Sequence, residues 1–205
     1  MSMNSEFELS IATDIANDAS LDAGLDSAEN NFLAEIGQDL PLQEVEVWTE
    51  KAEGRQRQIT AMIRIPHPAE KIWQILTDYD HLADFIPNLA ESRQINHPQG
   101  GIRIEQMGAQ SFLKFKFCAR VVLDMIEQFP SRIDFKMVEG DFKVYTGSWI
   151  LQPFTLANGA GVELYYTVSI LPPRTMPIGL IERRLKHSLT LNLSAIRQRA
   201  EILFS

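Results

Sequence analysis

The stretch IGLIERRLKHSLTLNLSAIRQRAEIL, residues 178–203, contains no proline, and Gly179 near its start is its single glycine. Apolar residues recur in it at three- and four-residue spacing, which is the period of a helix with one buried face. The pattern predicts one amphipathic helix of about 26 residues, or ~39 Å at 1.5 Å per residue. The predicted apolar stripe consists of Ile181, Leu185, Leu189, Asn192, Leu193, Ile196, Ala200 and Leu203.

Six segments with alternating apolar and polar residues precede this helix. In the last of them Val162, Leu164 and Tyr166 share one face, and the segment follows the turn dipeptide Asn158-Gly159. Consecutive strands that are joined by short turns form an antiparallel sheet. Such a sheet commonly has one apolar and one solvated face. The six predicted strands are residues 91–96, 101–107, 112–124, 131–138, 142–152 and 161–170.

The residues before these strands predict one further strand and two short helices. Residues 59–65 alternate as a strand and are followed by Pro66 and Pro68, residues 69–77 have helical spacing, and 78–89 fit a bent second helix that ends before Pro87. A sheet with one apolar face needs a cover, and the long helix is large enough to provide it. We therefore predict an α+β fold. In it, a curved antiparallel sheet of seven strands surrounds the C-terminal helix, and two short helices follow strand 1.

The net charge of −8 is distributed unevenly along the 205 residues. Residues 1–40 contain nine acidic residues and no lysine or arginine. Residues 1–42 also have too little apolar surface for a core. We predict an acidic, disordered arm at 1–42 and one folded domain at 43–205. A short amphipathic helix at 29–36 that docks on a basic face of the domain is the alternative.

Composition argues against several classes of protein. No run of apolar residues approaches the ~18 that a transmembrane helix needs. Cys118 is the single cysteine, which excludes a disulfide within the chain and argues against a cysteine-based zinc site. The start of the chain lacks the basic residues and the apolar run of a secretory signal. We expect a cytoplasmic protein, with peripheral membrane contact as a further option.

The order of the predicted elements resembles the helix-grip fold of START-like proteins in the SRPBCC superfamily. The segment IPHPAEKIWQILTDYDHLADFIPNLAESRQI, residues 65–95, is similar to the polyketide cyclase/dehydrase and coenzyme Q-binding START family, most closely to its cyanobacterial and chloroplast forms. That family has a proline and an aromatic residue around its first helix, followed by a tyrosine and a Phe-x-Pro element. The matching positions are Pro68, Trp73, Tyr79 and Phe85-Ile86-Pro87. Residues 139–151 and 181–201 also resemble the family, so the resemblance covers about 45–203.

The resemblance implies an elongated cavity between the sheet and the long helix. We expect a hydrophobic ligand there, in contact with Phe115, Phe117, Phe135, Met137, Trp149, Tyr166, Leu185, Ser188, Leu189 and Asn192. We expect a gate over its mouth, formed by Tyr79, Leu82, Phe85, Ile86 and Pro87. Ubiquinone-binding members follow Phe-x-Pro with Trp-Cys, whereas Asn88-Leu89 stand here. The expected ligand is therefore another isoprenoid quinone, a lipid or a pigment-like molecule.

Asn192 and Ser188 are polar residues on the apolar stripe of the long helix. A buried amide costs free energy unless it is hydrogen bonded. Two hypotheses follow for Asn192: its amide bonds nearby backbone, or it bonds a carbonyl or hydroxyl of the ligand.

Three functions fit these patterns. The first is non-catalytic binding or transport of a hydrophobic ligand. The second is a cyclase or dehydratase that acts on a polyketide-type substrate. Such an enzyme needs a positioned acid or base in the cavity. The candidates are Glu105, Arg103, Tyr145 and Arg184, and strand alternation places the first two on the outward face. The third is a protein- or ribosome-binding module with a vestigial cavity.

Charged clusters elsewhere give weaker signals. Asp78, Asp80 and Asp84 surround His81, and we interpret them as a solvated helix end or as part of the gate. We expect no metal and no cofactor, because no second histidine has ligand spacing. Basic residues on the last helix and on the outer sheet suit a solvated surface or contact with an anionic membrane. We do not expect nucleic acid binding, because no stacking aromatics interleave with the outward bases of 112–124. The basic residues of the outer sheet are Lys114, Lys116, Arg120, Arg132 and Lys136.

Overall fold

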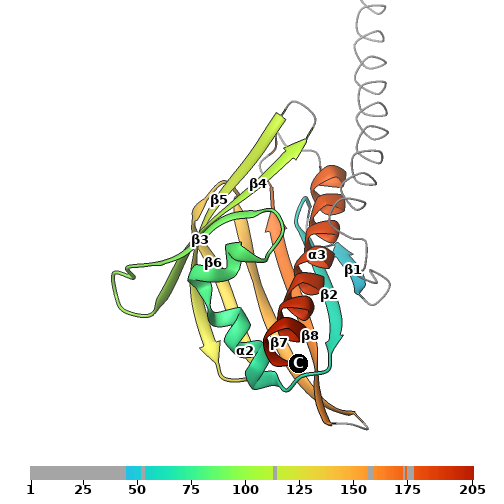
Figure 1. Ribbon diagram of the computed structural model, residues 1–205. Helices are drawn as coiled ribbons and strands as arrows, with labels where there is room; N and C mark the ends of the chain where they lie inside the picture. The colour runs from blue at the N-terminus through green and yellow to red at the C-terminus, as the bar shows by residue number, and fades with distance from the viewer. Residues whose placement is uncertain (1–44, 52–53, 113–114, 157–158, 173, 175–177) are drawn as a thin grey trace, which may run out of the picture. The chain divides into compact units, whose positions relative to one another are not determined.

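The computed structural model describes residues 45–51, 54–112, 115–156, 159–172, 174 and 178–205 (Figure 1). The chain divides into two compact units. The described residues of the first unit, 1–40 with 111–116, are the tips of two strands. The second unit, residues 41–110 with 117–205, contains all the elements discussed below apart from these two tips. The predicted acidic arm at 1–42 lies outside the described residues.

Eight strands form one sheet, in the order β1-β2-β8-β7-β6-β5-β4-β3. The chain passes from β3 to β8 through neighbouring strands, as the short turns predict, and β8 then pairs antiparallel with β2. The strands are β1 (Glu46–Lys51), β2 (Arg57–Ile65), β3 (Leu89–Ile95), β4 (Ile102–Phe112), β5 (Phe115–Gln128), β6 (Arg132–Gly140), β7 (Val144–Leu156) and β8 (Gly159–Leu171).

The eighth strand is β1, which the sequence analysis missed when it predicted seven. It pairs antiparallel with β2, with Val47 opposite Ala61. Val47 packs against the core, while Glu46, Trp48 and Glu50 are exposed. An edge strand that presents charged residues is a common protection against unwanted pairing. The same charges weaken the apolar alternation by which a strand is recognised.

The helices lie at the predicted positions. Helix α2 (Ala69–Thr77) begins after Pro68, whose extended backbone precedes the first turn. The predicted bent helix is a short 3-10 helix, η2 (Tyr79–Asp84), and it ends where the Phe85 N–H donates to the Leu82 carbonyl. Helix α3 (Ile178–Phe204) has 27 residues. Among the described residues, no helix combines the length and apolar character that crossing a bilayer requires.

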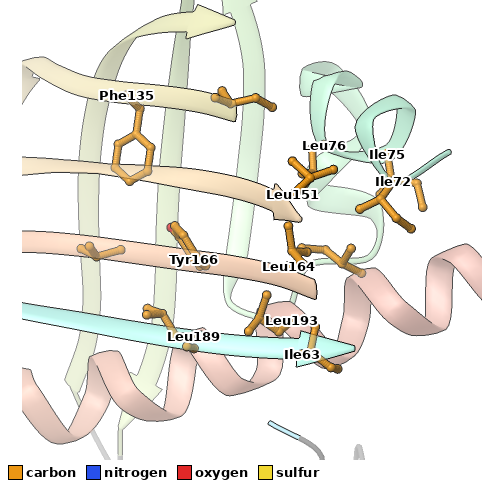
Figure 2. Close-up of a cluster of buried hydrophobic side chains, with 14 of the residues drawn as sticks. Ile63, Ile72, Ile75, Leu76, Phe135, Leu151, Leu164, Tyr166, Leu189 and Leu193 are labelled. Atoms are coloured by element: carbon orange, nitrogen blue, oxygen red, sulfur yellow. The ribbon is translucent and has the colours of Figure 1, made fainter. Parts of the chain in front are cut away.

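The core lies between the sheet and α3. The helix packs mainly on β2 and also contacts β8 and β1. Figure 2 shows Leu189 and Leu193 on the side of α3 that faces the strands, where Ile63 and Leu164 lie. Leu164 and Leu193 are 0% exposed. Helix α2 adds Ile72, Ile75 and Leu76 at one end of this core. The predicted arrangement, a sheet that surrounds its C-terminal helix, is therefore confirmed.

The outer face of the sheet carries arginines that are paired with carboxylates. Arg120 Nε donates to Glu105 Oε1 at 2.6 Å, and its Nη1 donates to Glu139. Arg132 Nη2 donates to Asp134 Oδ1 at 2.6 Å. Exposed pairs of this kind contribute little stability. These pairs place negative charges among the basic residues that were expected on this face. The side chains of Lys114 and Lys116 lie outside the described part of the chain.

Candidate functional site

A cavity of about 240 Å³, partly open to the outside, lies between the inward face of the sheet and α3. Strands β4 to β8 supply most of its wall, and α2, η2 and the residues that follow η2 close part of it. Helix α3 lines the remaining side with residues at about one-turn spacing, since Ile181, Leu185, Ser188, Asn192 and Ile196 all face the cavity. Alternation on the strands and helical period on α3 therefore converge on one site.

Six of the ten predicted ligand-binding residues line this cavity. They are Phe135, Trp149, Tyr166, Leu185, Ser188 and Asn192. Leu189 is 2% exposed but belongs to the core, because it lies one residue beyond Ser188 and points to the strands. Met137 packs against the core without lining the cavity. Its sulfur lies close to Gly140, 2.8 Å from where a Cβ on that glycine would be. The side chains of Phe115 and Phe117 lie outside the described part.

Four of the five predicted gate residues also line the cavity: Tyr79, Leu82, Ile86 and Pro87. Phe85 does not. Its ring lies 5.5 Å from the guanidinium carbon of Arg199 on α3, a distance within the range of cation–π attraction. This contact joins the segment after η2 to the helix on the other side of the cavity.

The start of η2 is held by three hydrogen bonds to neighbouring strands. The Tyr79 hydroxyl donates to Glu127 Oε1 at 2.7 Å, and Ser92 Oγ donates to the Tyr79 carbonyl at 2.6 Å. The Gln94 N–H donates to Asp80 Oδ1 at 2.6 Å. Burial raises the pKa of Tyr79 far above its usual value, and the bond to Glu127 raises it further. Tyr79 is therefore a fixed, protonated part of the wall.

One wall of the cavity is a continuous series of five aromatic rings. The Phe142 ring stacks on Tyr145 with centroids 5.6 Å apart, and Tyr145 lies 5.6 Å from Phe135. Phe135 lies 6.1 Å from Tyr166, whose ring stacks on Trp149 at 3.5 Å and 11°. Figure 2 shows Phe135 and Tyr166 projecting from neighbouring parts of the sheet toward the same interior space.

Two tyrosines of this wall, Tyr145 and Tyr166, line the cavity. Burial raises the pKa of both phenols above the usual value. Both hydroxyls therefore keep their protons at neutral pH.

Gly147 makes room for this wall. It lies opposite Phe135 in the β6–β7 pair. An added Cβ would lie 2.4 Å from the ring of Phe135 and 2.0 Å from the carbonyl oxygen of Thr167. The Phe135 ring thus lies against a position that has no side chain, and the backbone of β8 leaves no space for one.

Gly147→Ala is expected to lower the free energy of unfolding by about 1–3 kcal/mol, because an added methyl group in a tightly packed site forces neighbours to move. Urea denaturation measures this effect. Gly179→Ala on α3 is the matched control, since its added Cβ meets no atom within 4 Å and alanine favours a helix. Equal free energies of unfolding in the two variants would contradict the assignment.

Polar groups that the sequence analysis missed also line the cavity. Gln106 has the same strand parity as Ile104, so alternation could have identified it. Asn88 appeared only as a departure from the ubiquinone-binding pattern; it lines the cavity and adopts a positive φ of 63°. Among the described residues its Nδ2 is buried without a hydrogen-bond partner.

The four residues considered for catalysis separate into two pairs. Glu105 and Arg103 lie on the outer face, as alternation predicts, where Arg103 Nε donates to Asp124 Oδ1 at 2.5 Å. The bonds from Arg93 and Arg120 lower the pKa of Glu105 below its usual value. Tyr145 and Arg184 line the cavity.

The acidic cluster around His81 is part of the surface. His81 Nδ1 lies 2.7 Å from Asp78 Oδ1, and both side chains are more than half exposed. The bond to Asp78 raises the pKa of His81. Across the described residues, no group of three or more histidine, cysteine, aspartate or glutamate side chains is placed to hold a metal ion.

Comparison with known proteins gives a family and a fold. Residues 65–193 match the family described as "Polyketide cyclase / dehydrase and lipid transport". No curated protein matches the chain at a significant level. The predicted START-like resemblance is thereby confirmed at the level of the family.

Solved structures with this fold come from several bacteria. A STAR-related lipid transfer protein from Xanthomonas axonopodis is 15% identical, with a TM-score of 0.60 over 78% of this chain and 94% of its own. The Zhui aromatase/cyclase from Streptomyces sp. R1128 is 17% identical, with a TM-score of 0.57 over 71% and 94%. A START superfamily protein from Mycobacterium smegmatis is 13% identical, with a TM-score of 0.61 over 71% and 98%. At these identities the likeness concerns the fold, and it agrees with the predicted helix grip.

Proposed function

Because the chain belongs to the polyketide cyclase/dehydrase and lipid transport family, we propose that its cavity binds and carries a hydrophobic small molecule without changing it chemically. The observation that carries this proposal is the cavity of about 240 Å³ and its largely apolar, aromatic wall. Small-molecule sites typically combine such a concave apolar surface with a few polar groups. An isoprenoid quinone, a lipid or a pigment-like molecule has the matching chemistry.

The protonation of the lining phenols supports binding rather than cyclisation or dehydration. Those reactions need a general acid or base whose pKa lies near the working pH. Tyr79, Tyr145 and Tyr166 line the cavity, and burial raises the pKa of each above its usual value. Glu105, the carboxylate considered as a base, lies on the outer face. The lining phenols are therefore suited to donating hydrogen bonds to a bound molecule.

The cavity also favours a ligand over a pure interaction module. A vestigial cavity would be expected to fill with side chains, because protein interiors pack to high density. Here side chains from six strands, α2, η2 and α3 surround an open space. The empty volume is consistent with a site that accepts a guest.

Thermal unfolding with added ligands tests the proposal. The panel contains decylbenzoquinone, farnesol, oleic acid and a phospholipid. A ligand that binds the folded state stabilises it by about 2.7 kcal/mol at one hundred times its Kd. We expect at least one member of the panel to raise the Tm in a concentration-dependent way. A Tm that stays constant with every member would contradict the proposal.

Asn192→Leu tests whether this amide serves the ligand. Asn192 lines the cavity between Ser188 and Ile196. We expect the variant to bind the best ligand of the panel about fivefold more weakly, because one hydrogen bond contributes roughly 1 kcal/mol. Its free energy of unfolding should not fall, since leucine suits the apolar stripe. Gln198→Leu, at an exposed position of the same helix, is the control. A stable Asn192→Leu variant with unchanged affinity would assign the amide to a structural role.

A further inference from the structure

We propose that Asn88 is the residue by which the cavity holds the polar end of its guest, because its side-chain amide donates a hydrogen bond to an acceptor atom there. The guest is then an amphiphile, with its acceptor beside Asn88 and its apolar body against the aromatic wall. This inference rests on the proposed binding function, to which it adds a recognition residue and an orientation.

The backbone at Asn88 accepts an asparagine but does not require its amide. Pro87 and Asn88 are the central residues of a turn in which the Leu89 N–H donates to the Ile86 carbonyl oxygen at 3.4 Å. Asn88 has a positive φ of 63°, and a turn with proline followed by a residue at positive φ accepts glycine or asparagine. Glycine would suit this backbone at least as well. The amide therefore needs a reason of its own.

The position of the amide supplies that reason. Asn88 lines the cavity, and its Nδ2 atom is buried with no hydrogen-bond partner on any residue that the structure describes. Of the buried side-chain polar atoms that have no partner in this part of the chain, it is the one that belongs to a cavity residue. A buried donor that lacks an acceptor costs free energy. An acceptor atom on a guest removes this cost, because it supplies the missing partner inside the cavity.

Two small residues leave room for a guest beside Asn88. Gly108 on β4 and Ala119 on β5 both line the cavity. A Cβ added to Gly108 would lie 3.7 Å from the carbonyl oxygen of Asn88 and 3.8 Å from that of Ala119, so the three residues are neighbours. Residues of this size fill little of the space next to the amide. We call Asn88, Gly108 and Ala119 the Asn88 corner.

The Asn88 corner and the aromatic wall occupy different strands of one cavity. The corner consists of the residue before β3 and of residues on β4 and β5, whereas the wall comes mainly from β6, β7 and β8. The strand order β8-β7-β6-β5-β4-β3 places the wall and the corner one after the other along the sheet. Aromatic faces favour the apolar part of a guest, and the corner offers a hydrogen-bond donor. An amphiphile that spans both satisfies them together.

Asn88→Gly tests the assignment, because glycine keeps the turn and removes the amide. The guest is the best ligand of the thermal panel, of which every member carries an acceptor oxygen. We expect its affinity to fall about fivefold, the equivalent of one hydrogen bond. The fluorescent probe N-phenyl-1-naphthylamine has no oxygen to accept this bond, so its affinity should stay within about twofold. An unchanged affinity for the panel ligand, or an equal loss for both molecules, overturns the inference.

Asn96→Gly is the matched control, because it makes the same substitution at an exposed position after β3. Both affinities should stay unchanged in it. The guest-free Asn88→Gly protein should have a Tm at least as high as that of Asn96→Gly, since its glycine enters a positive φ and a buried donor is removed. A lower Tm would assign the amide to the fold and overturn the inference.

Asn88→Asp is a second variant that separates the donor from the size of the side chain. Aspartate has nearly the same size and also tolerates a positive φ, but its carboxylate donates no hydrogen bond. We expect it to weaken the panel ligand at least as much as Asn88→Gly does. Full affinity in Asn88→Asp overturns the assignment of the donor.

The side-chain amide also reports on the bond directly. Its resonances in nitrogen–proton correlation spectra are identified by their loss in Asn88→Gly. We expect them to shift when the panel ligand binds and to move less with N-phenyl-1-naphthylamine. Resonances that the panel ligand leaves in place overturn the inference.

The outcomes distinguish this inference from the function on which it rests. Binding of the panel ligand with equal affinity to the unmodified protein, Asn88→Gly and Asn88→Asp contradicts only the inference. Binding of N-phenyl-1-naphthylamine when the whole panel fails also contradicts the inference, because a guest without an acceptor is then preferred. Failure of the panel and of this probe contradicts both.

Discussion

Ala119→Phe is expected to abolish ligand binding while the protein remains folded. Ala119 lies on β5 and lines the cavity with a side chain that is not fully buried. A phenylalanine ring at this position extends into the open space rather than into packed neighbours. A guest and an added ring cannot share a cavity of about 240 Å³, so the affinity for the best ligand of the panel should fall by about two orders of magnitude.

Calorimetric titration measures this loss, and thermal unfolding without ligand shows that the fold persists. Lys136→Phe adds a ring to the exposed face of β6 and should leave the affinity unchanged. Full affinity in Ala119→Phe would mean that the ligand binds elsewhere on the protein. Equal losses in both variants would mean that an added aromatic ring, and not the filled cavity, causes the effect.

Leu193→Ala is expected to cause the largest loss of stability among the substitutions considered. Leu193 is 0% exposed in the interface between α3 and the sheet. Removing a fully buried leucine side chain costs about 2–5 kcal/mol, because apolar contact is lost and a void remains. Urea denaturation measures the change in the free energy of unfolding.

Leu203→Ala is the matched control for this experiment. It makes the same substitution on the same helix, but Leu203 is 49% exposed. Surface substitutions usually change stability by less than about 0.5 kcal/mol. If both variants lost the same free energy, α3 would not be the helix that the sheet grips.

Much of this fold is predictable because its elements have strong periods. The stripe from Ile181 to Ala200 has one-turn spacing and indicates α3 directly. Val162, Leu164 and Tyr166 alternate in β8, and all three are buried. Strand β1 was missed because its exposed residues include Glu46 and Glu50, and because its pairing with β2 is a tertiary contact that no local pattern records.

The cavity is predictable in part, for the same reason. The two-residue alternation of a strand determines which face a residue occupies, and it correctly placed Trp149 and Tyr166 inward. Period does not determine whether an inward residue meets a neighbour or an open space, so Leu189 was expected to touch a ligand and instead belongs to the core. Phe142 falls inside the predicted strand 142–152, but β7 begins at Val144, so Phe142 lies between β6 and β7 and its place in the aromatic wall depends on its stack with Tyr145.

The most direct test of the central claim is native mass spectrometry of the full-length protein purified from its own host, combined with organic extraction. The account predicts a co-purifying hydrophobic molecule in near-stoichiometric amount. It also predicts that this molecule is missing from Ala119→Phe. A protein that is isolated empty, or that carries the same molecule equally in Ala119→Phe, would contradict the claim that this cavity is a carrier site.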